Sequence, residues 1–406
     1  MDTQTHSGTS GRWANTQFLV MAYTLSAIMA GATVASPLYP IYEEVFHIGP
    51  GGVTIAYTAY MVGTLLALLF LGHLSDHLGH IRTLRVAATL ALAGLVLSGV
   101  APDLLILSIG RFTIGVAAGI ASTSATAGLV AASPPNRLRQ ASSIGSLMTI
   151  VGLGLGPLVG GFIAQDLPFP LHLPYGVLGG ALLLALVALG SQRHGQPSTI
   201  AGFFPRLRFH LPDMHQVKQF ATVAVIAFIG YTLFSLFASL APSFFDTFLP
   251  WDGPAVGGIG VAMLFAASAA AQVTFTGIDP KRGLVVGSLL VTAALAMLAA
   301  SVKFSSGLLF IASDVLGGFG QGLTFMSALL VVNAMTTSVR RAGMISSFFT
   351  IAYLGGIVPV LGLGVAADRL GLDASLIGLS ILMAAIAGTL TFAAQRLVSN
   401  VQCHSR

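Results

Sequence analysis

The sequence predicts an all-α integral membrane protein with twelve transmembrane helices, and three observations lead to that prediction. Charged residues make up only 8% of the 406 residues and hydrophobic residues 55%, whereas charged residues are about a quarter of an ordinary soluble protein. Long apolar segments recur along the whole chain, each near the roughly 20 residues that a helix needs to cross a bilayer. The alternating pattern of a membrane β-barrel is absent. A soluble, disordered or collagen-like chain is therefore excluded, and the single cysteine, Cys403, excludes an intramolecular disulfide.

Twelve segments are long and apolar enough to span the bilayer. They lie near 18–38, 53–71, 85–101, 104–131, 141–164, 174–190, 219–241, 255–277, 283–301, 307–335, 342–366 and 374–394. Several are short and interrupted by glycine, so a count of eleven stays open. Residues 1–17 lack the pattern of a cleavable signal peptide, and we expect the first apolar segment to be retained as a helix.

The distribution of Lys and Arg predicts the orientation, because short cytoplasmic loops carry an excess of both residues. With the N-terminus inside, the cytoplasmic segments hold Arg12, Arg82, Arg85, Arg137, Arg139, Arg193, Arg206, Arg208, Lys218, Lys281, Arg282, Arg340, Arg341, Arg396 and Arg406. The outer loops hold only Lys303 and Arg369, together with most of the acidic residues. We therefore expect a multi-pass protein of the bacterial inner membrane with both termini in the cytoplasm.

The chain divides into two similar halves. We expect a six-helix bundle over 1–190, a cytoplasmic linker over 191–218 and a second bundle over 219–406. The pattern Arg-x-x-x-Gly-x-x-x-Gly that starts at Arg111 has a counterpart starting at Asp314, 203 residues later. Two parallel six-helix repeats are a known transporter architecture, in which the substrate binds midway between the halves.

Three motifs in the first half resemble those of the major facilitator superfamily. The loop after the second segment, GHLSDHLGHIR over 72–82, is similar to the gating loop of that family. The fourth segment carries the Arg111 motif, and the fifth carries GLGLGPLVGG over 152–161, which resembles the signature of proton-coupled exporters. The resemblance covers nearly the whole chain and implies a 12-helix drug or multidrug antiporter.

The gating loop has its family residues at Gly72, Asp76, Gly79 and Arg82. The resemblance implies that Asp76 locks the outward-open state by pairing near helix ends. His77 and His80 replace the usual arginines, which makes the lock weaker or dependent on pH, since histidine titrates near neutrality. The alternative interpretation is that Asp76 only stabilises a tight loop.

The exporter signature predicts a close helix contact. Three of its glycines recur every fourth residue on one helix face, where small residues allow helices to approach, and its proline bends the helix. The residues concerned are Gly152, Gly156, Pro157, Gly160 and Gly161. The resemblance implies that this helix packs across the interface between the halves. The eighth segment offers a matching surface of small residues: Gly257, Gly258, Gly260, Ala266, Ala269 and Ala270. Ordinary glycine packing between membrane helices is the alternative.

Arg111 and Asp314 are the charged residues that lie clearly inside apolar segments. Such residues are costly in hydrocarbon unless they are paired or face water. We expect both to face the central cavity at equal depth, with Asp314 carrying the coupling proton and Arg111 tuning its proton affinity. A permanent ion pair between the halves is the alternative.

Other side chains could line a substrate cavity or serve only in packing and in hydrogen bonds between helices. The candidates for cavity lining are Tyr23, Tyr39, Tyr231, Phe234, Gln321 and Asn333. No acidic residue occurs in the first apolar segment, where many drug antiporters carry one.

The sequence shows no catalytic motif, no metal-binding spacing, no phosphate-binding loop and no basic patch for nucleic acid. We therefore expect no enzyme activity, metal or cofactor. We expect a monomeric, secondary active transporter that exports small lipophilic compounds by proton antiport through alternating access. A proton-coupled metabolite or sugar carrier of the same fold is one alternative, and a membrane receptor that transports nothing is another.

Overall fold

The structure is a computed structural model that describes residues 7–134, 137–192, 212–214, 216–240, 242, 244, 250–335 and 341–397. Within these residues, 12 helices are long and apolar enough to cross a membrane, and no strand occurs. The predicted all-α membrane fold with twelve spans is therefore confirmed, and the count of eleven is wrong. The greater part of the predicted linker, 193–211, lies outside the described residues.

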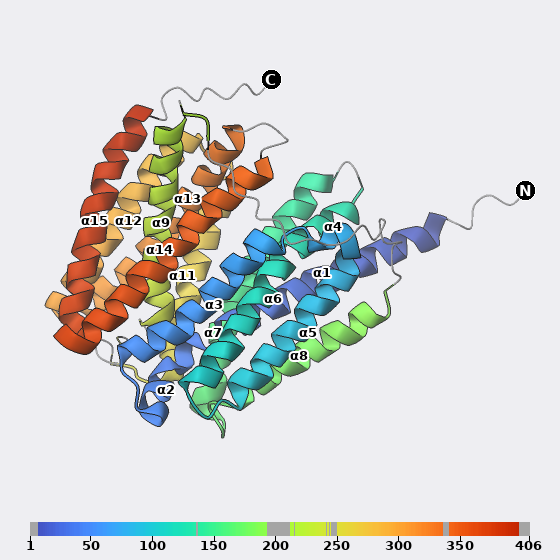
Figure 1. The fold of residues 1–406 in the computed structure, drawn as a ribbon, viewed down its shortest axis with the longest axis horizontal. Helices are drawn as coiled ribbons and strands as arrows, with labels where there is room; N and C mark the ends of the chain where they lie inside the picture. The colour runs from blue at the N-terminus through green and yellow to red at the C-terminus, as the bar shows by residue number, and fades with distance from the viewer. Residues whose placement is uncertain are drawn as a thin grey trace, which may run out of the picture.

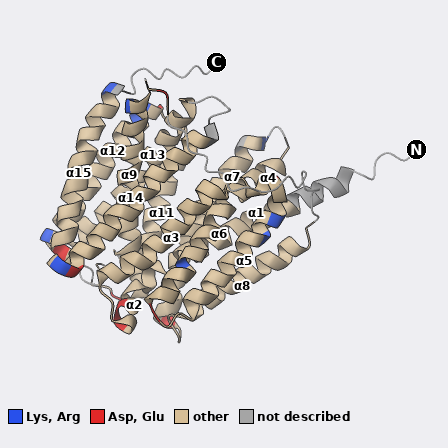
Figure 2. Ribbon diagram, viewed as in Figure 1, with Lys and Arg blue, Asp and Glu red and all other residues tan. Residues whose placement is uncertain are grey.

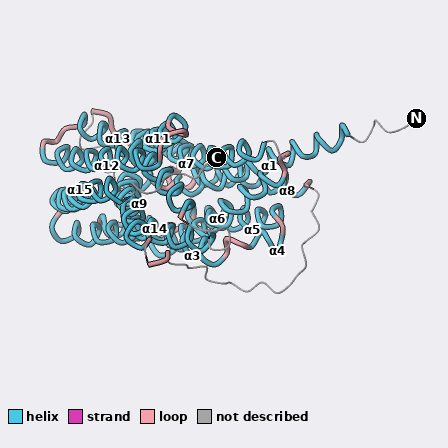
Figure 3. The backbone as a smooth tube through the Cα atoms, turned by 90° about the horizontal axis from the view of Figure 1, so that it is seen from above, coloured by secondary structure: helices cyan, strands magenta, loops and turns pink. Residues whose placement is uncertain are grey.

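The helices fall into two groups that follow the two halves of the sequence (Figure 1). The first group consists of α1 (Ser7–Thr33), η1 (Ser36–Leu38), α2 (Tyr39–Phe46), α3 (Pro50–Phe70), α4 (Leu74–Leu78), α5 (His80–Gly99), α6 (Leu104–Ala131), α7 (Leu138–Asp166) and α8 (Leu173–Gly190). The second consists of α9 (Val217–Ser239), α11 (Pro254–Thr274), α12 (Pro280–Lys303), α13 (Gly307–Ala334), α14 (Arg341–Leu370) and α15 (Leu372–Leu397). We call these groups the N-bundle and the C-bundle, and Figure 3 shows them side by side.

Local sequence explains where several helices begin. Pro50, Pro254 and Pro280 occupy the first turns of α3, α11 and α12, where a missing backbone N–H costs nothing. Asp103 and Asp279 cap α6 and α12, because each side chain accepts a hydrogen bond from a backbone N–H in the first turn. Such caps typically contribute about 1 kcal/mol.

The first span is longer than predicted, running over Thr16–Phe46 instead of 18–38. Its continuous α-helix ends at Thr33, and the 3₁₀ turn η1 and the short helix α2 continue it. Pro37 and Pro40 each stand in the first turn of a new element, because proline cannot continue the hydrogen-bond ladder of a preceding helix.

The two ends of the helix array differ in charge (Figure 2). We call the end with α4, the α11–α12 loop and the end of α15 the basic face, and the end with α2 the acidic face. Described Lys and Arg at the basic face are Arg82, Arg85, Arg137, Lys218, Lys281, Arg282 and Arg396. Described acidic residues at the other face are Glu43, Glu44, Asp103, Asp166, Asp252, Asp368 and Asp373. Fewer charges of the opposite sign occur at each face, including Asp76 and Asp279 at the basic face and Lys303 and Arg369 at the acidic face.

The internal repeat is visible in the packing. Gly115 and Gly119 bring α6 against the backbone of α3, so closely that a Cβ atom at either position would overlap it. Gly318 and Gly322 do the same for α13 against α11. Small residues at these positions let helices meet backbone to backbone in a membrane. The two six-helix repeats expected from the motif spacing are therefore confirmed.

The bundles contact each other along two lines, α3 with α14 and α7 with α11. In Figure 1 the bundles converge toward the acidic face and separate toward the basic face. The core of each bundle is apolar, and the space that is left between the bundles holds the candidate site.

Candidate functional site

A cavity of about 330 Å³ lies between the two bundles. Helices α3, α6 and α7 of the N-bundle and α9, α11, α13 and α14 of the C-bundle all contribute to its walls. Its lining includes Tyr57, Tyr60, Thr64, Leu68, Arg111, Ser122, Thr126, Ser146, Tyr231, Phe234, Phe265, Ser268, Gln272, Gln321, Phe325, Phe349 and Tyr353. Several of these, such as Leu68 and Gln272, lie within a turn of the basic ends of their helices, so the cavity extends from the middle of the protein toward the basic face.

Arg111 is the charged residue of the cavity wall. Its side chain is 1% exposed, and its guanidinium carbon lies 5.1 Å from the centre of the Tyr60 ring. The phenol groups of Tyr39, Tyr57 and Tyr175 are also close enough to interact with it electrostatically. Nε and Nη1 of Arg111 have no hydrogen-bond partner among the described residues. Aromatic faces and phenols thus surround a cation that no carboxylate neutralises.

Asp314 lies behind the cavity wall rather than on it. The residue is fully buried in α13, and neither carboxylate oxygen has a hydrogen-bond partner among the described residues. The cavity residue Gln321 is two helical turns away on the same face, about 10 Å along the axis. The expectation that Asp314 and Arg111 both face the cavity is therefore wrong in this conformation, and the two residues form no ion pair. The repeat places them at equal positions, but only Arg111 lines the cavity.

The candidate lining residues divide into two sets. Tyr231, Phe234 and Gln321 line the cavity, as expected. Tyr23 is 42% exposed and donates a hydrogen bond to the Ala181 carbonyl of α8, because its side of α1 faces that helix. Tyr39 is buried beside Arg111, outside the lining. Asn333 donates to the Leu329 carbonyl of its own helix, so these three side chains are not part of the wall.

Sequence reasoning missed two tyrosines that line the cavity beside Arg111. Tyr60 stacks with Arg111, and the Tyr57 hydroxyl lies 3.1 Å from Ser235 Oγ in α9 of the other bundle. Both residues lie in the second span, three positions apart, and so face one side of α3. Their spacing was a usable signal, but only the fold shows that this side of α3 faces Arg111.

The glycines of the exporter signature make a different contact from the one expected. Gly152, Gly156 and Gly160 face the backbone of the first span within the same bundle. The contact across the bundles belongs to the neighbouring face of α7, where Pro157 and Gly161 meet Gly258 and Pro254 of α11. The signature therefore serves both interfaces, and the contact between bundles lies in the half of α7 nearer the acidic face.

The predicted gating loop forms the short helix α4 and the turn that follows it. Gly79 has φ 79°, a conformation that favours glycine. Asp76 is exposed and interacts electrostatically with His80, and α4 contacts α5 and α6 of its own bundle. Arg82 is exposed, whereas Arg85 donates to the Leu189 carbonyl at the end of α8, with 3.2 Å between Nε and the oxygen.

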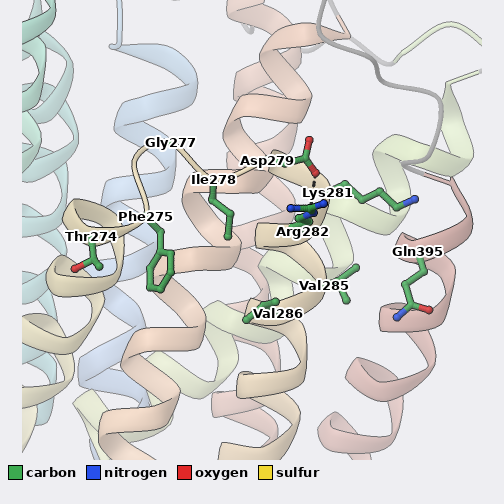
Figure 4. A pocket seen from close by; sticks show the side chains of 10 residues that line it. All are labelled: Thr274, Phe275, Gly277, Ile278, Asp279, Lys281, Arg282, Val285, Val286 and Gln395. Atoms are coloured by element: carbon green, nitrogen blue, oxygen red, sulfur yellow. Dashed lines mark hydrogen bonds between the residues drawn. The ribbon is translucent and has the colours of Figure 1, made fainter.

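A second hollow, of about 730 Å³, lies at the basic face of the C-bundle (Figure 4). Its walls come from the end of α11, the start of α12 and Gln395 of α15. Asp279 and Arg282 lie in it and share the capping hydrogen bond of α12. Because this hollow involves one bundle only, it is separate from the cavity between the bundles.

Two hydrogen bonds close the acidic side between the bundles. The Gly51 N–H of α3 donates to Asp368 Oδ1 of α14 at 3.1 Å, and the Ala255 N–H of α11 donates to Gln165 Oε1 of α7 at 3.0 Å. Each acceptor caps the first turn of a helix in the opposite bundle. Gln165 and Asp368 stand 203 residues apart, so they are equivalent positions of the repeat. We call this pair the outer caps.

Comparison with known proteins gives the family. The sequence profile described as Major Facilitator Superfamily matches residues 20–360. The chain belongs to the Major Facilitator Superfamily. Members of this superfamily are transporters, which agrees with the prediction that the chain is not an enzyme, and it is a multi-pass membrane protein.

Curated superfamily members share low identity with the chain. The quinolone resistance protein NorA of Staphylococcus aureus is 24% identical over 59% of this chain and 61% of its own length. The uncharacterized MFS-type transporter YceJ of Bacillus subtilis is 26% identical over 56% of this chain and 57% of its own. A chloroplastic D-xylose-proton symporter-like protein of Arabidopsis thaliana is 33% identical over 29% of this chain and 21% of its own. The chain thus spans about three fifths of the length of the first two relatives.

Solved structures of superfamily transporters share the fold. A bacterial homolog of the human lysosomal transporter Spinster, in an inward-facing and unoccupied conformation, has a TM-score of 0.73 at 14% identity, covering 95% of this chain and 97% of its own. A proton-dependent oligopeptide transporter has a TM-score of 0.74 at 13% identity, covering 95% of this chain and 98% of its own. At these identities the likeness establishes the fold.

The outer caps give a first prediction. Replacing Asp368 by Ala removes the acceptor for the Gly51 N–H, and losing a cap costs about 0.5–2 kcal/mol. We expect the population open at the acidic face to rise about two- to thirtyfold, because only the closed state makes this hydrogen bond. Spin labels at residues 105 and 308, which are equivalent exposed positions near that face, would report the change as a longer distance.

Asp373→Ala is the matched control, because Asp373 is an exposed acid of the same face outside the two contact lines. Gln165→Ala should act in the same direction as Asp368→Ala. Equal distance distributions in Asp368→Ala and in the unmodified protein would show that the cap does not stabilise the closure.

Proposed function

We propose that this protein exports small lipophilic compounds in exchange for protons by alternating access. The observation that carries the proposal is the cavity between the two bundles, which is closed toward the acidic face and extends toward the basic face. A rocking motion that opens the α3–α14 and α7–α11 contacts would turn the same cavity toward the other side.

The basic face is assigned to the cytoplasm of a bacterial inner membrane, with both termini inside. The gathering of Lys and Arg at one face (Figure 2) supports this orientation, since short cytoplasmic loops carry the excess of positive charge. The conformation is then inward-facing, and the likeness to a transporter solved in an inward-facing conformation agrees with it. One chain builds the whole cavity, so a monomer is the proposed working unit.

Asp314 is the proposed proton carrier. A fully buried carboxyl group without a hydrogen-bond partner is far more stable neutral than ionised, so Asp314 holds its proton while the acidic side is closed. Opening toward the acidic face would bring water to the carboxyl group and allow protons to exchange. Arg111 then acts on the cavity rather than as a fixed ion-pair partner. The loop around Asp76 remains the proposed gating element.

Lipophilic substrates fit the walls better than sugars do. Aromatic and aliphatic side chains together make up more than half of the cavity lining, beside Ser, Thr and Gln residues. The ring centres lie 4.7 Å apart for Phe234 and Phe265 and 5.3 Å apart for Tyr231 and Tyr353. A sugar site would need more convergent polar groups. The relatives include both a quinolone resistance protein and a D-xylose-proton symporter-like protein, so a metabolite carrier is the second candidate.

The test is accumulation of fluorescent dyes in efflux-deficient cells that express this chain. Three lipophilic dyes, one anionic, one neutral and one cationic, would be measured with and without a protonophore. We expect lower accumulation of at least one dye than in cells with an empty vector, and we expect the protonophore to remove that difference.

Equal accumulation of all three dyes in both kinds of cell, with the protein confirmed in the membrane, would contradict drug export. Sugar-driven proton uptake in the same cells would then favour the metabolite carrier. No flux of any tested compound would favour a receptor.

A further inference from the structure

The charge of the cavity indicates which substrates it accepts. Among the described residues that line it, Arg111 is the single ionisable residue with a full charge at neutral pH, and none is Asp or Glu. Asp314, the acid that was expected to face Arg111, is fully buried and outside the lining, and neither carboxylate oxygen has a hydrogen-bond partner among the described residues. The inward-facing cavity therefore carries an uncompensated positive charge.

The surroundings of Arg111 do not remove that charge. Its guanidinium contacts the face of Tyr60 and lies near three further phenols, which are neutral groups. Two of its nitrogens have no hydrogen-bond partner among the described residues, although the side chain is 99% buried. A cation within low-dielectric walls projects its field into the adjoining cavity, where little water screens it. The cavity thus attracts anions and repels cations.

The rest of the cavity wall indicates the shape of the substrate. Tyr231, Phe325 and Tyr353 form a cluster of rings on the C-bundle. The ring centre of Tyr353 lies 5.3 Å from that of Tyr231, and the ring centre of Phe325 lies 6.0 Å from it. A smaller polar group adjoins it, in which Ser268 donates to Gln321 Oε1 at 3.0 Å. One positive group on the N-bundle thus faces a broad aromatic surface on the C-bundle.

We propose that the substrates are amphipathic aromatic anions, such as ring-bearing carboxylates, whose anionic group is oriented toward Arg111 while the ring stacks on the aromatic cluster. This inference rests on the proposed function and narrows its substrate class. Export of such anions also suits proton antiport, because a membrane potential that is negative inside favours both anions leaving and protons entering.

The test is binding to the purified protein in lipid nanodiscs, without any gradient. Three probes share one ring system and differ in charge: 1-naphthoate, its neutral methyl ester and 1-naphthylmethylammonium. We expect naphthoate to bind about tenfold more tightly than the ammonium compound, which corresponds to about 1.4 kcal/mol. Arg111→Gln should weaken naphthoate by about the same factor and leave the ester nearly unchanged, whereas Arg111→Lys should retain part of the binding.

A second variant keeps the test decisive if Arg111→Gln does not fold. Gln321→Glu adds one carboxylate to the cavity and keeps Arg111, so it should weaken naphthoate and strengthen the ammonium compound. Tyr23→Phe, at a position away from the cavity, is the control and should change neither affinity. Equal or tighter binding of the ammonium compound, unchanged naphthoate binding in Arg111→Gln or Gln321→Glu, or no binding of any probe would overturn the proposal.

The binding test and the cell assay can fail independently of each other. Naphthoate binding that depends on Arg111, without efflux that the protonophore abolishes, would support the substrate class and contradict proton-driven export. Protonophore-sensitive efflux of the cationic dye alone would support export and overturn the anion proposal.

Discussion

Replacing Asp314 by Asn should reduce proton-coupled transport by at least about tenfold. Asn has nearly the shape of a protonated Asp, so the buried site in α13 keeps its packing and the fold is retained. Asn cannot release a proton, and a membrane-buried ionisable residue is by default part of the transport chemistry. The measurement uses proteoliposomes with a pH-sensitive dye inside, in which substrate added outside drives proton movement.

Substrate counterflow at equal pH is the accompanying measurement, because it needs the alternating cavity but no net proton transfer. We expect counterflow to persist in Asp314→Asn while proton movement is lost. Asp252→Asn, at an exposed acid of the acidic face, should leave both unchanged. Normal proton movement in Asp314→Asn would exclude Asp314 as the carrier, and another ionisable group would have to take its role.

Replacing Gly258 by Ala should shift the conformational equilibrium toward the state that is open at the acidic face. A Cβ atom at this position would overlap the Pro157 carbonyl oxygen of α7 and lie 3.3 Å from the Cα of Gly161. Both neighbours are backbone atoms, which cannot move aside as a flexible side chain can. Overpacking of this kind costs about 1–3 kcal/mol, which changes the ratio of the two states about five- to more than a hundredfold.

The measurement is again the distance between spin labels at residues 105 and 308, on a background in which Cys403, the single cysteine, is replaced by Ser. Gly180→Ala is the matched control, because the space around a Cβ atom in that part of α8 is open. It makes the same chemical change in a helix without disturbing an interface. A distance distribution in Gly258→Ala equal to that of the control would show that the α7–α11 contact does not limit opening.

These two predictions separate the two parts of the transport cycle. The first concerns the proposed exchange of protons at Asp314, whereas Gly258 and the outer caps concern the closure at the acidic face. Asp314→Asn should lose proton exchange and keep the conformational change. Gly258→Ala should keep the proton site but spend less time with the cavity open at the basic face.

The membrane class, the repeat and the family could be predicted from the sequence alone, and the spans could be placed with a count of twelve or eleven. These properties depend on composition and on short, local patterns: apolar runs of bilayer length, motifs such as the one at Arg111, and the recurrence of that motif at Asp314. Span ends were less well predicted, as in the first span, because Pro37 and Pro40 break the helix without ending the crossing.

The residues that come together in the site could be identified only from the packing of the helices. A helix with glycines on one face and apolar residues all round can pack by several faces, so the sequence could not show that Gly156 faces the first span while Gly258 meets α7. The same holds for the equivalent pair Arg111 and Asp314, one on the cavity wall and the other sealed. The rotation of each helix and the angle between the bundles settle such questions, and both arise from contacts between residues far apart in the chain.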